Sequence, residues 1–499
     1  MDTNTLTAPA DTNAVPSTLN TNGRSMSLQD CIQEALTHNL DVQIERYQPQ
    51  ISYYGVRTSY GGYDPTFSFS GQRNYNDQGA AFENGIIIPP TITAGNSFDS
   101  SLNGNTPWGM SYTLGAINSP FVVSETHAQG NNTNANLAEN TSGSVGLSLT
   151  QPVLKNFWID QTRLNIRLAK NQLKSDEQGL RLQIINSVTA VENAYYELIF
   201  AQENVKVQEE ALNLAQTQLD QDRQRVQIGT LAQLDVQQDE AQVATSQANL
   251  IAAQYTLVQN QNTLKNLLTD AYAKWHDTDI QPKAALAAPP QSFDLQHSWK
   301  QGMTKRPDLL QERLLVERQG IQLKFDRNQL FPEIDLVGSY GFNGSGKEYS
   351  DVFSQINDGS RPFYTAGAQL TVPLSNQGPR NTYKASKITL QQLLLKLKQF
   401  EQNVLVQIDN AVKNAQSTYQ SVQATRQARI YAEAALDAEE KKYTVGKSTT
   451  FTVLQLQDNL TSARSQEIRA LANYNEALSN LAQQEGTTLE RNRIDIQVR

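Results

Sequence analysis

Two stretches of the chain repeat one pattern of hydrophobic and polar positions around a glycine. One constant offset carries Gly229 to Gly446 and Val236 to Val453. In each copy a helical pattern runs up to the glycine, where a left-handed C-cap is least costly, and a second helical pattern follows. The chain is therefore predicted to contain two tight helical hairpins.

The helix after the first glycine has the periodicity of a coiled coil. Its seam repeats every seven residues at Val236, Val243, Leu250, Leu257 and Leu264. A second predicted seam runs beside it at Ala241, Ala248 and Tyr255. Heptads of this kind are typical of helices packed lengthwise. Thr230 and Gln233 have the spacing of a capping box at the helix start.

A second repeat supports a duplication. Residues 28–60 have helical apolar spacing, with Ser27 as a plausible cap and a kink expected at Pro49. The pattern returns from residue 295, and another single offset carries Asp41 to Asp308 and Pro65 to Pro332. The sequence predicts two copies of one unit.

Strict alternation of apolar and small polar residues marks four strands. The runs lie at 66–70, 145–149, 334–342 and 364–372, and a proline precedes the first and the third. Period two with one polar face indicates strands that meet water on one side. Each run has roughly the length that a bilayer requires. Alternation alone is equally typical of an antiparallel sheet on a soluble core.

Helix lengths favour the membrane interpretation. Residues 160–227 contain no proline and would form a helix about 100 Å long at ~1.5 Å per residue. Residues 379–443 match it in length, and helices at 28–60 and 230–269 together equal one long helix. One long helix beside two stacked shorter ones makes a rod. Four strands are too few to form its core, and an open sheet would expose its edges.

Composition excludes several classes of protein. The net charge of −9 argues against a nucleic-acid partner, because a phosphate backbone must be neutralised by Lys and Arg. Cys31 is the single cysteine, so no disulfide framework or cysteine metal site is expected, and it is predicted to be a core residue. There is no run of ~18 apolar residues for a transmembrane helix. The start of the chain lacks the basic and apolar regions of a signal peptide.

No constellation of catalytic residues is evident. The four histidines are scattered and have no metal-ligand spacing. A nucleophile elbow, a phosphate-binding loop and a carboxylate pair in a pocket context are also absent from the sequence. We therefore expect neither an enzyme nor a cofactor.

The order of these elements resembles the TolC-type outer-membrane efflux protein family over residues 27–486. The resemblance rests on NLD at 39–41 and RPD at 306–308, on the proline that opens each first strand, and on the two turns QIGTLAQLDVQQDE and TVGKSTTFTVLQLQD. No single motif is specific, but their order and doubling are.

The resemblance implies a mixed α+β, mainly α fold with an internal two-fold repeat. It implies a homotrimer in which each chain gives four strands to a 12-stranded transmembrane β-barrel, continuous with a 12-helix coiled-coil α-barrel. Such a duct lies in the outer membrane of a Gram-negative-type bacterium, surrounded by outer-membrane lipid, and extends into the periplasm. Its partners are a periplasmic adaptor (membrane fusion) protein and an inner-membrane pump of the RND, ABC or MFS type.

The implied function is passive conduction in efflux or type I secretion. Cargo is chosen by the pump, so the sequence does not separate the two. A soluble periplasmic coiled-coil scaffold or adaptor protein is the alternative function.

The resemblance places the functional residues at the two turns. The expected adaptor-docking residues are Ile228, Gly229, Thr230, Val445, Gly446 and Lys447. The expected periplasmic gate is formed by Asp235, Asp239 and Arg225. Three copies of Asp235 would make a ring that attracts cations, although Thr452 takes its place in the second turn.

Simpler roles remain open for these residues. The glycines serve as turn residues in any case, and acids near a helix start can be solvated and favoured by the helix dipole. Four bases precede the turns, and they either pair with the acids across subunits or form a solvated face. They are Arg223, Arg225, Lys441 and Lys442.

The expected boundaries follow the repeats. Residues 1–26 are a flexible N-terminus, 27–269 the first repeat, 270–293 a linker, 294–485 the second repeat and 486–499 a C-terminal tail. An Asn-, Gly-, Ser- and Thr-rich insertion at 72–140 is expected outside the cell as an extended hairpin plus a mobile loop, because short alternating runs lie near 98–102 and 108–114. Its candidates for an aromatic girdle are Trp108, Tyr112 and Phe121.

Overall fold

The computed structural model describes residues 22–83, 85–88, 91–117, 120–128 and 138–495. The chain divides into two compact units. Unit 1 comprises Met1–Tyr47, Gly179–Asp308 and Glu401–Arg499, and unit 2 comprises Gln48–Gln178 and Leu309–Phe400. The two longest helices contribute residues to both units.

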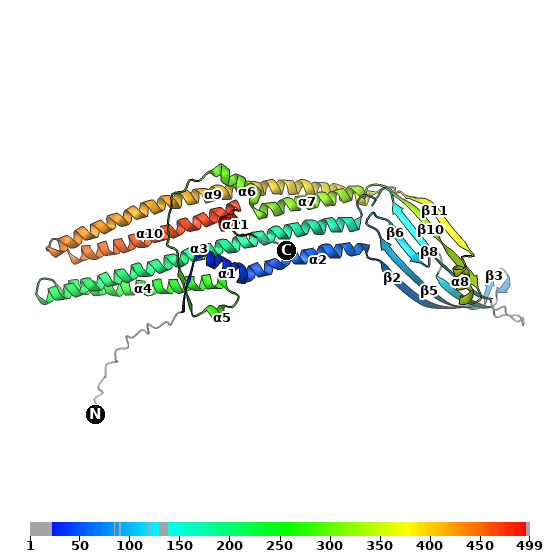
Figure 1. The fold of residues 1–499 in the computed structure, drawn as a ribbon, viewed down its shortest axis with the longest axis horizontal. Coiled ribbons are helices and arrows are strands. Elements are labelled where there is room, and N and C mark those ends of the chain that lie inside the picture. The colour runs from blue at the N-terminus through cyan, green and yellow to red at the C-terminus, as the bar shows by residue number, and fades with distance from the viewer. Residues whose placement is uncertain (1–21, 84, 89–90, 118–119, 129–137, 496–499) are drawn as a thin grey trace, which may run out of the picture. The chain divides into compact units, whose positions relative to one another are not determined.

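Unit 1 is built on two helical hairpins (Figure 1). The first joins α3 (Gln161–Gln227) to α4 (Gln233–Leu268), and the second joins α9 (Gln377–Thr444) to α10 (Thr450–Glu485). The long helices have 67 and 68 residues and the shorter ones 36 each. Long uninterrupted helices therefore lie where the proline-free stretches predicted them.

The predicted helix over residues 28–60 is two helices. The chain breaks at Asn39, between α1 (Leu28–His38) and α2 (Leu40–Tyr60), whereas Pro49 lies inside α2. The Asn39 side chain accepts a hydrogen bond from the backbone N–H of Val42 and donates one to the carbonyl of Leu267, so the break is satisfied on both sides. The sequence predicted no break at Asn39, and the kink expected at Pro49 remains a prediction.

The second half breaks at the corresponding motif. Arg306 separates α6 (Leu295–Lys305) from α7 (Pro307–Asn328). Its guanidinium donates to both carboxylate oxygens of Asp308, at 3.1 and 2.6 Å, and to the amide oxygens of Gln407 and Gln484, both at 2.9 Å. In both the NLD and the RPD motif, a side chain therefore stabilises the break between two helices by hydrogen bonds.

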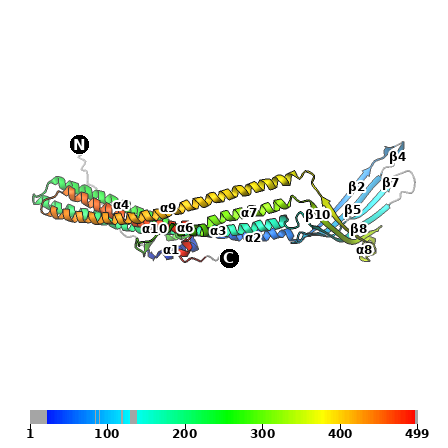
Figure 2. The same cartoon turned by 90° about the horizontal axis from the view of Figure 1, so that it is seen from above.

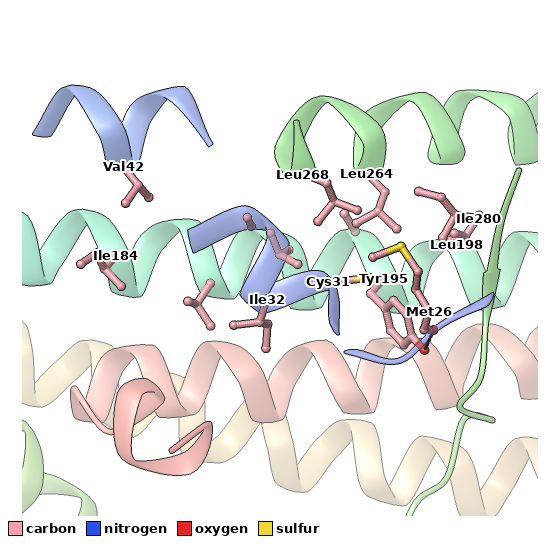
Figure 3. Close-up of a cluster of buried hydrophobic side chains, with 14 of the residues drawn as sticks. Met26, Cys31, Ile32, Val42, Ile184, Tyr195, Leu198, Leu264, Leu268 and Ile280 are labelled. Carbon is pink, nitrogen blue, oxygen red and sulfur yellow. Dashed lines mark hydrogen bonds between the residues drawn. The ribbon is translucent and has the colours of Figure 1, made fainter. Parts of the chain in front are cut away.

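An apolar core holds the middle of unit 1 together (Figure 3). Cys31 lies in it fully buried, as predicted, and burial raises the pKa of its thiol to about 12. Tyr195 of α3 is also fully buried, and its hydroxyl donates to the carbonyl of Met26. Residues 22–26, expected in the flexible N-terminus, form β1 (Asn22–Met26), which pairs in parallel with β9 (Thr278–Pro282). Short helices α5 (Tyr272–Trp275) and α11 (Thr488–Arg491) complete the unit.

Unit 2 carries a seven-stranded sheet (Figure 2). Its order is β11-β10-β8-β6-β5-β2, and β7 pairs with β5 and β8. The strands are β2 (Thr66–Gln78), β5 (Thr91–Asn105), β6 (Ser111–Gly115), β7 (Phe121–Ala128), β8 (Ala138–Pro152), β10 (Glu333–Gly346) and β11 (Pro362–Thr371). Smaller elements are η1 (Gly61–Tyr63), β3 (Ala81–Glu83), β4 (Ile86–Ile88) and α8 (Tyr349–Asn357).

The count of four strands per chain was wrong, because three strands of the sheet come from the insertion. Residues 91–105 pair with β2 along its whole length, from Thr66↔Asn103 to Gln78↔Thr91. Asn, Gly, Ser and Thr dilute the alternation in this stretch, so the sequence predicted only a short run near 98–102 where the structure has a strand of 15 residues.

One of the expected girdle aromatics belongs to the interior of unit 2. Phe121 is buried, and its ring stacks on Phe98 and Phe353 with centroid distances of 5.1 Å in both cases. This stack ties β5 and β7 to α8. Trp108 is 59% exposed, as a girdle residue would be in a single chain.

None of the helices in the described part of the chain is sufficiently long and apolar to cross a membrane.

Candidate functional site at the hairpin turns

The two hairpin turns have one backbone geometry. Gly229 and Gly446 adopt left-handed φ angles of 76° and 72°. The N–H of the residue after each glycine donates to a carbonyl five residues back, from Thr230 to Arg225 and from Lys447 to Lys442, both at 2.9 Å. This is the hydrogen bond of a glycine C-cap, and only glycine adopts that φ without strain. The predicted turns are therefore present at the predicted glycines.

The helices after the turns begin differently. The N-cap of α10 is Thr449, whose hydroxyl accepts a hydrogen bond from the N–H of Thr452. The N-cap of α4 is Ala232, which cannot cap with its side chain. The hydroxyl of Thr230 instead donates to the carbonyl of Arg225. The predicted capping box of Thr230 and Gln233 was wrong, because α4 begins at Gln233.

The outer surface of the turns is apolar and open. Ile228 is 74% exposed and Val445 67% exposed. A Cβ added at Gly229 or Gly446 would meet nothing within 4 Å. Thr230 and Lys447 are exposed as well.

The interior of the first hairpin confirms the first predicted seam, with Val236, Leu250 and Leu264 buried, but not the second. Asp239 is fully buried, on a seam that continues through Ser246 and Ala253. The predicted second seam is exposed instead, and Tyr255 has 63% of its surface accessible. Asp239 lies three residues after Val236, so the phase of the first seam already placed it inside. It does not face solvent, as a gate carboxylate in a single chain would.

A buried carboxylate on α3 joins the first hairpin to the second. Asp222 is fully buried, and its Oδ2 accepts hydrogen bonds from the hydroxyl of Tyr443 on α9 at 2.7 Å and from the amide of Gln218 at 2.8 Å. The hydroxyl of Thr450 on α10 lies 3.4 Å from the same oxygen. Arg225 lies 3.5 Å from Oδ1, and its guanidinium stacks on the Tyr443 ring at 4.4 Å. These contacts link α3, α9 and α10.

The buried groups have shifted pKa values. Burial, the neighbouring Asp222 and then Asp235 raise the pKa of Asp239 to about 7. Burial is also the main cause that raises the pKa of Tyr443 to about 12, so its hydroxyl remains a donor. Neither carboxylate oxygen of Asp239 has a hydrogen-bond donor among the described residues.

The four bases before the turns are paired inside their own chain. Arg223 contacts Glu240 at 2.9 Å, and Arg225 contacts Asp222. Lys441 and Lys442 pair with acids on their own helix, one turn away. Each base thus has an acidic partner without a second subunit.

Asp235 occupies the first turn of α4 and is partly exposed. At the corresponding place in α10, Thr452 has a neutral side chain that bonds the cap. The first turn alone therefore presents an acid at this position. No group of three or more metal-ligating side chains occurs within the described ranges.

Sequence reasoning missed Asp222, Tyr443 and Thr450. Tyr443 stands three residues before Gly446, where an aromatic residue among lysines is conspicuous, but its partner is 221 residues away. Only the packing of the two hairpins identifies this contact.

A family model described as outer membrane efflux protein matches residues 121–269 and 301–487. Relatives include an outer membrane protein TolC of Vibrio cholerae, 26% identical over 363 residues, which cover 68% of this chain and 78% of that protein. The outer membrane efflux protein BepC of Brucella suis is 24% identical over 331 residues, covering 66% and 69% of the two chains.

Solved structures with the same fold are outer-membrane channels. The channel OprN aligns with a TM-score of 0.67 at 14% identity, covering 92% of this chain and 90% of that one. The Campylobacter jejuni CmeC channel aligns with a TM-score of 0.65 at 13% identity, covering 100% and 99%. The matched family segments include both hairpins.

Proposed function

The chain belongs to the outer membrane efflux protein family, and from that premise we propose how its hairpins and its sheet serve an exit channel. The chain is an outer-membrane exit channel of efflux systems, located in the Gram-negative outer membrane. The match over both halves of the chain carries this assignment. It does not favour a soluble scaffold, and the family is one of channels rather than enzymes.

The working form is a homotrimer of chains that each contain two copies of one unit. The sheet supports this assembly, because β2 and β11 are its two end strands and every residue of β2 is exposed. Phe67 on β2 and Tyr364 on β11 are 70% and 82% exposed. Open apolar edges invite pairing with another chain. Three sheets joined edge to edge would close the wall that meets outer-membrane lipid.

A helix face also lacks a partner within one chain. Five apolar residues of α2 are spaced as a heptad seam, and each is more than half exposed: Leu40, Ile44, Tyr47, Ile51 and Tyr54. A seam of this kind packs against a neighbouring helix. A second copy of the chain supplies such a helix in the homotrimer.

The hairpin turns are the docking end for a periplasmic adaptor protein, through which an inner-membrane pump of the RND, ABC or MFS type delivers substrate. Exposed Ile228 and Val445 form the apolar part of the contact, and Lys447 the charged part. The glycines let a partner approach the backbone closely. Asp235 is the gate acid, and three copies would attract cations. Arg225 acts behind the gate, through Asp222.

Light scattering of the purified chain in detergent tests the assembly. A protein mass near three times 55.5 kDa, with aggregation after detergent is removed, would support the channel. A stable monomer or dimer in plain buffer would rule it out.

Docking is tested separately by cross-linking the purified trimer to its adaptor. Ile228→Arg and Val445→Arg should reduce the yield at least tenfold, because each places a charge in an apolar contact. Gln221→Arg adds the same charge to an exposed position on α3 and serves as the matched control. Equal yields from all three variants would refute docking at the turns.

A further inference from the structure

The first hairpin contains two acids that water does not reach. Asp222 on α3 and Asp239 on α4 both have 0% exposure. Asp222 Oδ1 and both oxygens of Asp239 lack a hydrogen-bond donor in the described part of the chain. Two ionised carboxylates would repel each other strongly at such a place, and neither would be solvated. No side chain in the described ranges donates a hydrogen bond to Asp239, and Arg225 approaches Asp222 Oδ1 only to 3.5 Å.

We propose that Asp222 and Asp239 hold one proton between them, and that this shared proton supports the hydrogen bond from Tyr443 to Asp222 that joins the first hairpin to the second. A single proton gives a hydrogen-bond partner to two of the three unpartnered oxygens, because a protonated carboxyl group donates and an ionised one accepts. The same solution lets acid pairs in other proteins share a proton at close range.

The hydrogen bonds decide which acid carries the proton. Asp222 Oδ2 already accepts hydrogen bonds from the Tyr443 hydroxyl and the Gln218 amide. Asp239 receives no such donor. The proton therefore rests on Asp239 and is donated to Asp222.

The surrounding charges agree with this assignment. Arg225 on α3 faces Asp222 and favours its negative charge. Asp235 on α4 disfavours a charge on Asp239, in the same direction as burial. From α9, Tyr443 remains a neutral donor, and α10 contributes the uncharged hydroxyl of Thr450. One negative charge on the pair is thus matched by one nearby guanidinium.

The second hairpin lacks such a pair. The offset that relates the two turns places Glu439 at the position of Asp222 and Leu456 at that of Asp239. Leu456 packs against an apolar cluster, and Glu439 bonds to Lys442 and Ser448. The acid pair is therefore particular to the first hairpin and not a requirement of the turn.

Loss of the proton should loosen the ends of the hairpins. The pKa of Asp239 is raised from 3.8 to about 7, so the folded chain keeps the proton until the pH approaches 7. The stabilisation is complete below the unfolded pKa and disappears as pH rises through about 7. Asp222 then faces a second carboxylate, and its bond to Tyr443 is weakened. This consequence is independent of adaptor docking, because it involves one chain alone.

Infrared titration of the full-length protein in detergent tests the shared proton. The background carries Glu476→Gln, because burial and Glu197 raise the pKa of Glu476 to about 7 as well. A protonated-carboxyl band should then disappear with a midpoint near pH 7. Asp239→Asn should abolish this step. Asp220→Asn, which changes an exposed acid two residues before Asp222 on α3, should leave it intact.

Hydrogen exchange at residues 225–232 and 443–449 tests the joining of the hairpins. In Asp239→Asn the side-chain amide can donate a hydrogen bond to Asp222 at every pH. The variant is therefore the matched control for the intrinsic pH dependence of amide exchange. Wild type and variant should exchange alike below pH 7, and wild type at least threefold faster above it. If Asp239→Asn does not fold, Asp222→Asn replaces it, with the same expected loss of the pH step. A missing carboxyl step near pH 7, or a constant exchange ratio, would overturn the proposal.

Discussion

The two hairpins have the same turn but different interiors. Gly229 and Gly446 share φ angles within a few degrees and the same backbone hydrogen bonds. Behind the second turn, Leu436, Val453 and Leu460 form an apolar cluster around Tyr443. The first hairpin has apolar residues at the corresponding positions, but it also holds the two buried acids Asp222 and Asp239. A glycine turn therefore fixes the backbone, while the residues behind it decide how each hairpin responds to pH.

Tyr443 belongs to both interiors, so its removal should have the largest effect. Its ring packs in the apolar cluster of the second hairpin, and its hydroxyl bonds to Asp222 in the first. Tyr443→Ala should lower the free energy of local opening by ~3–5 kcal/mol, as expected for loss of a buried aromatic ring. Val226→Ala, at the corresponding position of the first hairpin, is the control and should cost ~1 kcal/mol. Hydrogen exchange at the turns measures both, and equal costs would contradict the shared role of Tyr443.

Asp239→Leu gives the first hairpin the side chain that the second hairpin has at the corresponding position, Leu456. Removal of the buried acid should stabilise the first hairpin by ~1–4 kcal/mol above pH 7, where wild type has two facing carboxylates. Below pH 4 the gain should be small, because the proton is present in wild type. Exchange measured at both pH values provides the comparison. A gain that is the same at both would show that Asp239 does not titrate.

Alanine at the two glycines should have equal effects. Each substitution forces a left-handed φ on a residue with a Cβ, which costs ~1–2 kcal/mol, and the Cβ itself meets no neighbour. Hydrogen exchange at each turn, measured as a function of temperature, should therefore show the same loss of stability in Gly229→Ala and Gly446→Ala. A difference above ~1 kcal/mol would mean that the turns are not equivalent.

Asp235→Asn should have the smallest effect on stability and act on conduction instead. Asp235 is partly exposed, so its replacement should change the free energy of unfolding by less than ~0.5 kcal/mol. Cation selectivity of single channels in planar bilayers should fall. Thr452→Val, at the corresponding place in the second hairpin, should leave selectivity unchanged. Identical cation selectivity in Asp235→Asn and wild type would show that Asp235 is not part of the gate.

The sequence predicted the parts of the fold that depend on local pattern. The hairpin glycines were predictable because one backbone conformation demands them, and the long helices because heptads and the absence of proline extend over many turns. The break at Asn39 was missed, because its side chain acts through a contact with Leu267, 228 residues away. The strand at 91–105 was predicted only in part, near 98–102, because the rest of it has a loop-like composition and pairs with β2 along its whole length.

Only the exposed residues of the candidate site could be predicted from the sequence. Ile228 and Val445 are exposed because they lie at a turn, and the sequence located the turn. The acid pair depends on how α3, α4, α9 and α10 meet. The heptad phase of Val236 did place Asp239 inside the hairpin, but nothing local indicated Asp222 as its neighbour.

A double-mutant cycle on Tyr443→Phe and Asp222→Asn tests most directly whether the two hairpins act as one unit. The account predicts a coupling free energy of ~0.5–3 kcal/mol below pH 7, measured by hydrogen exchange at residues 443–449, because each substitution weakens the same 2.7 Å hydrogen bond. The coupling should shrink above pH 7, where Asp239 has lost its proton. Effects that simply add at both pH values would contradict the account.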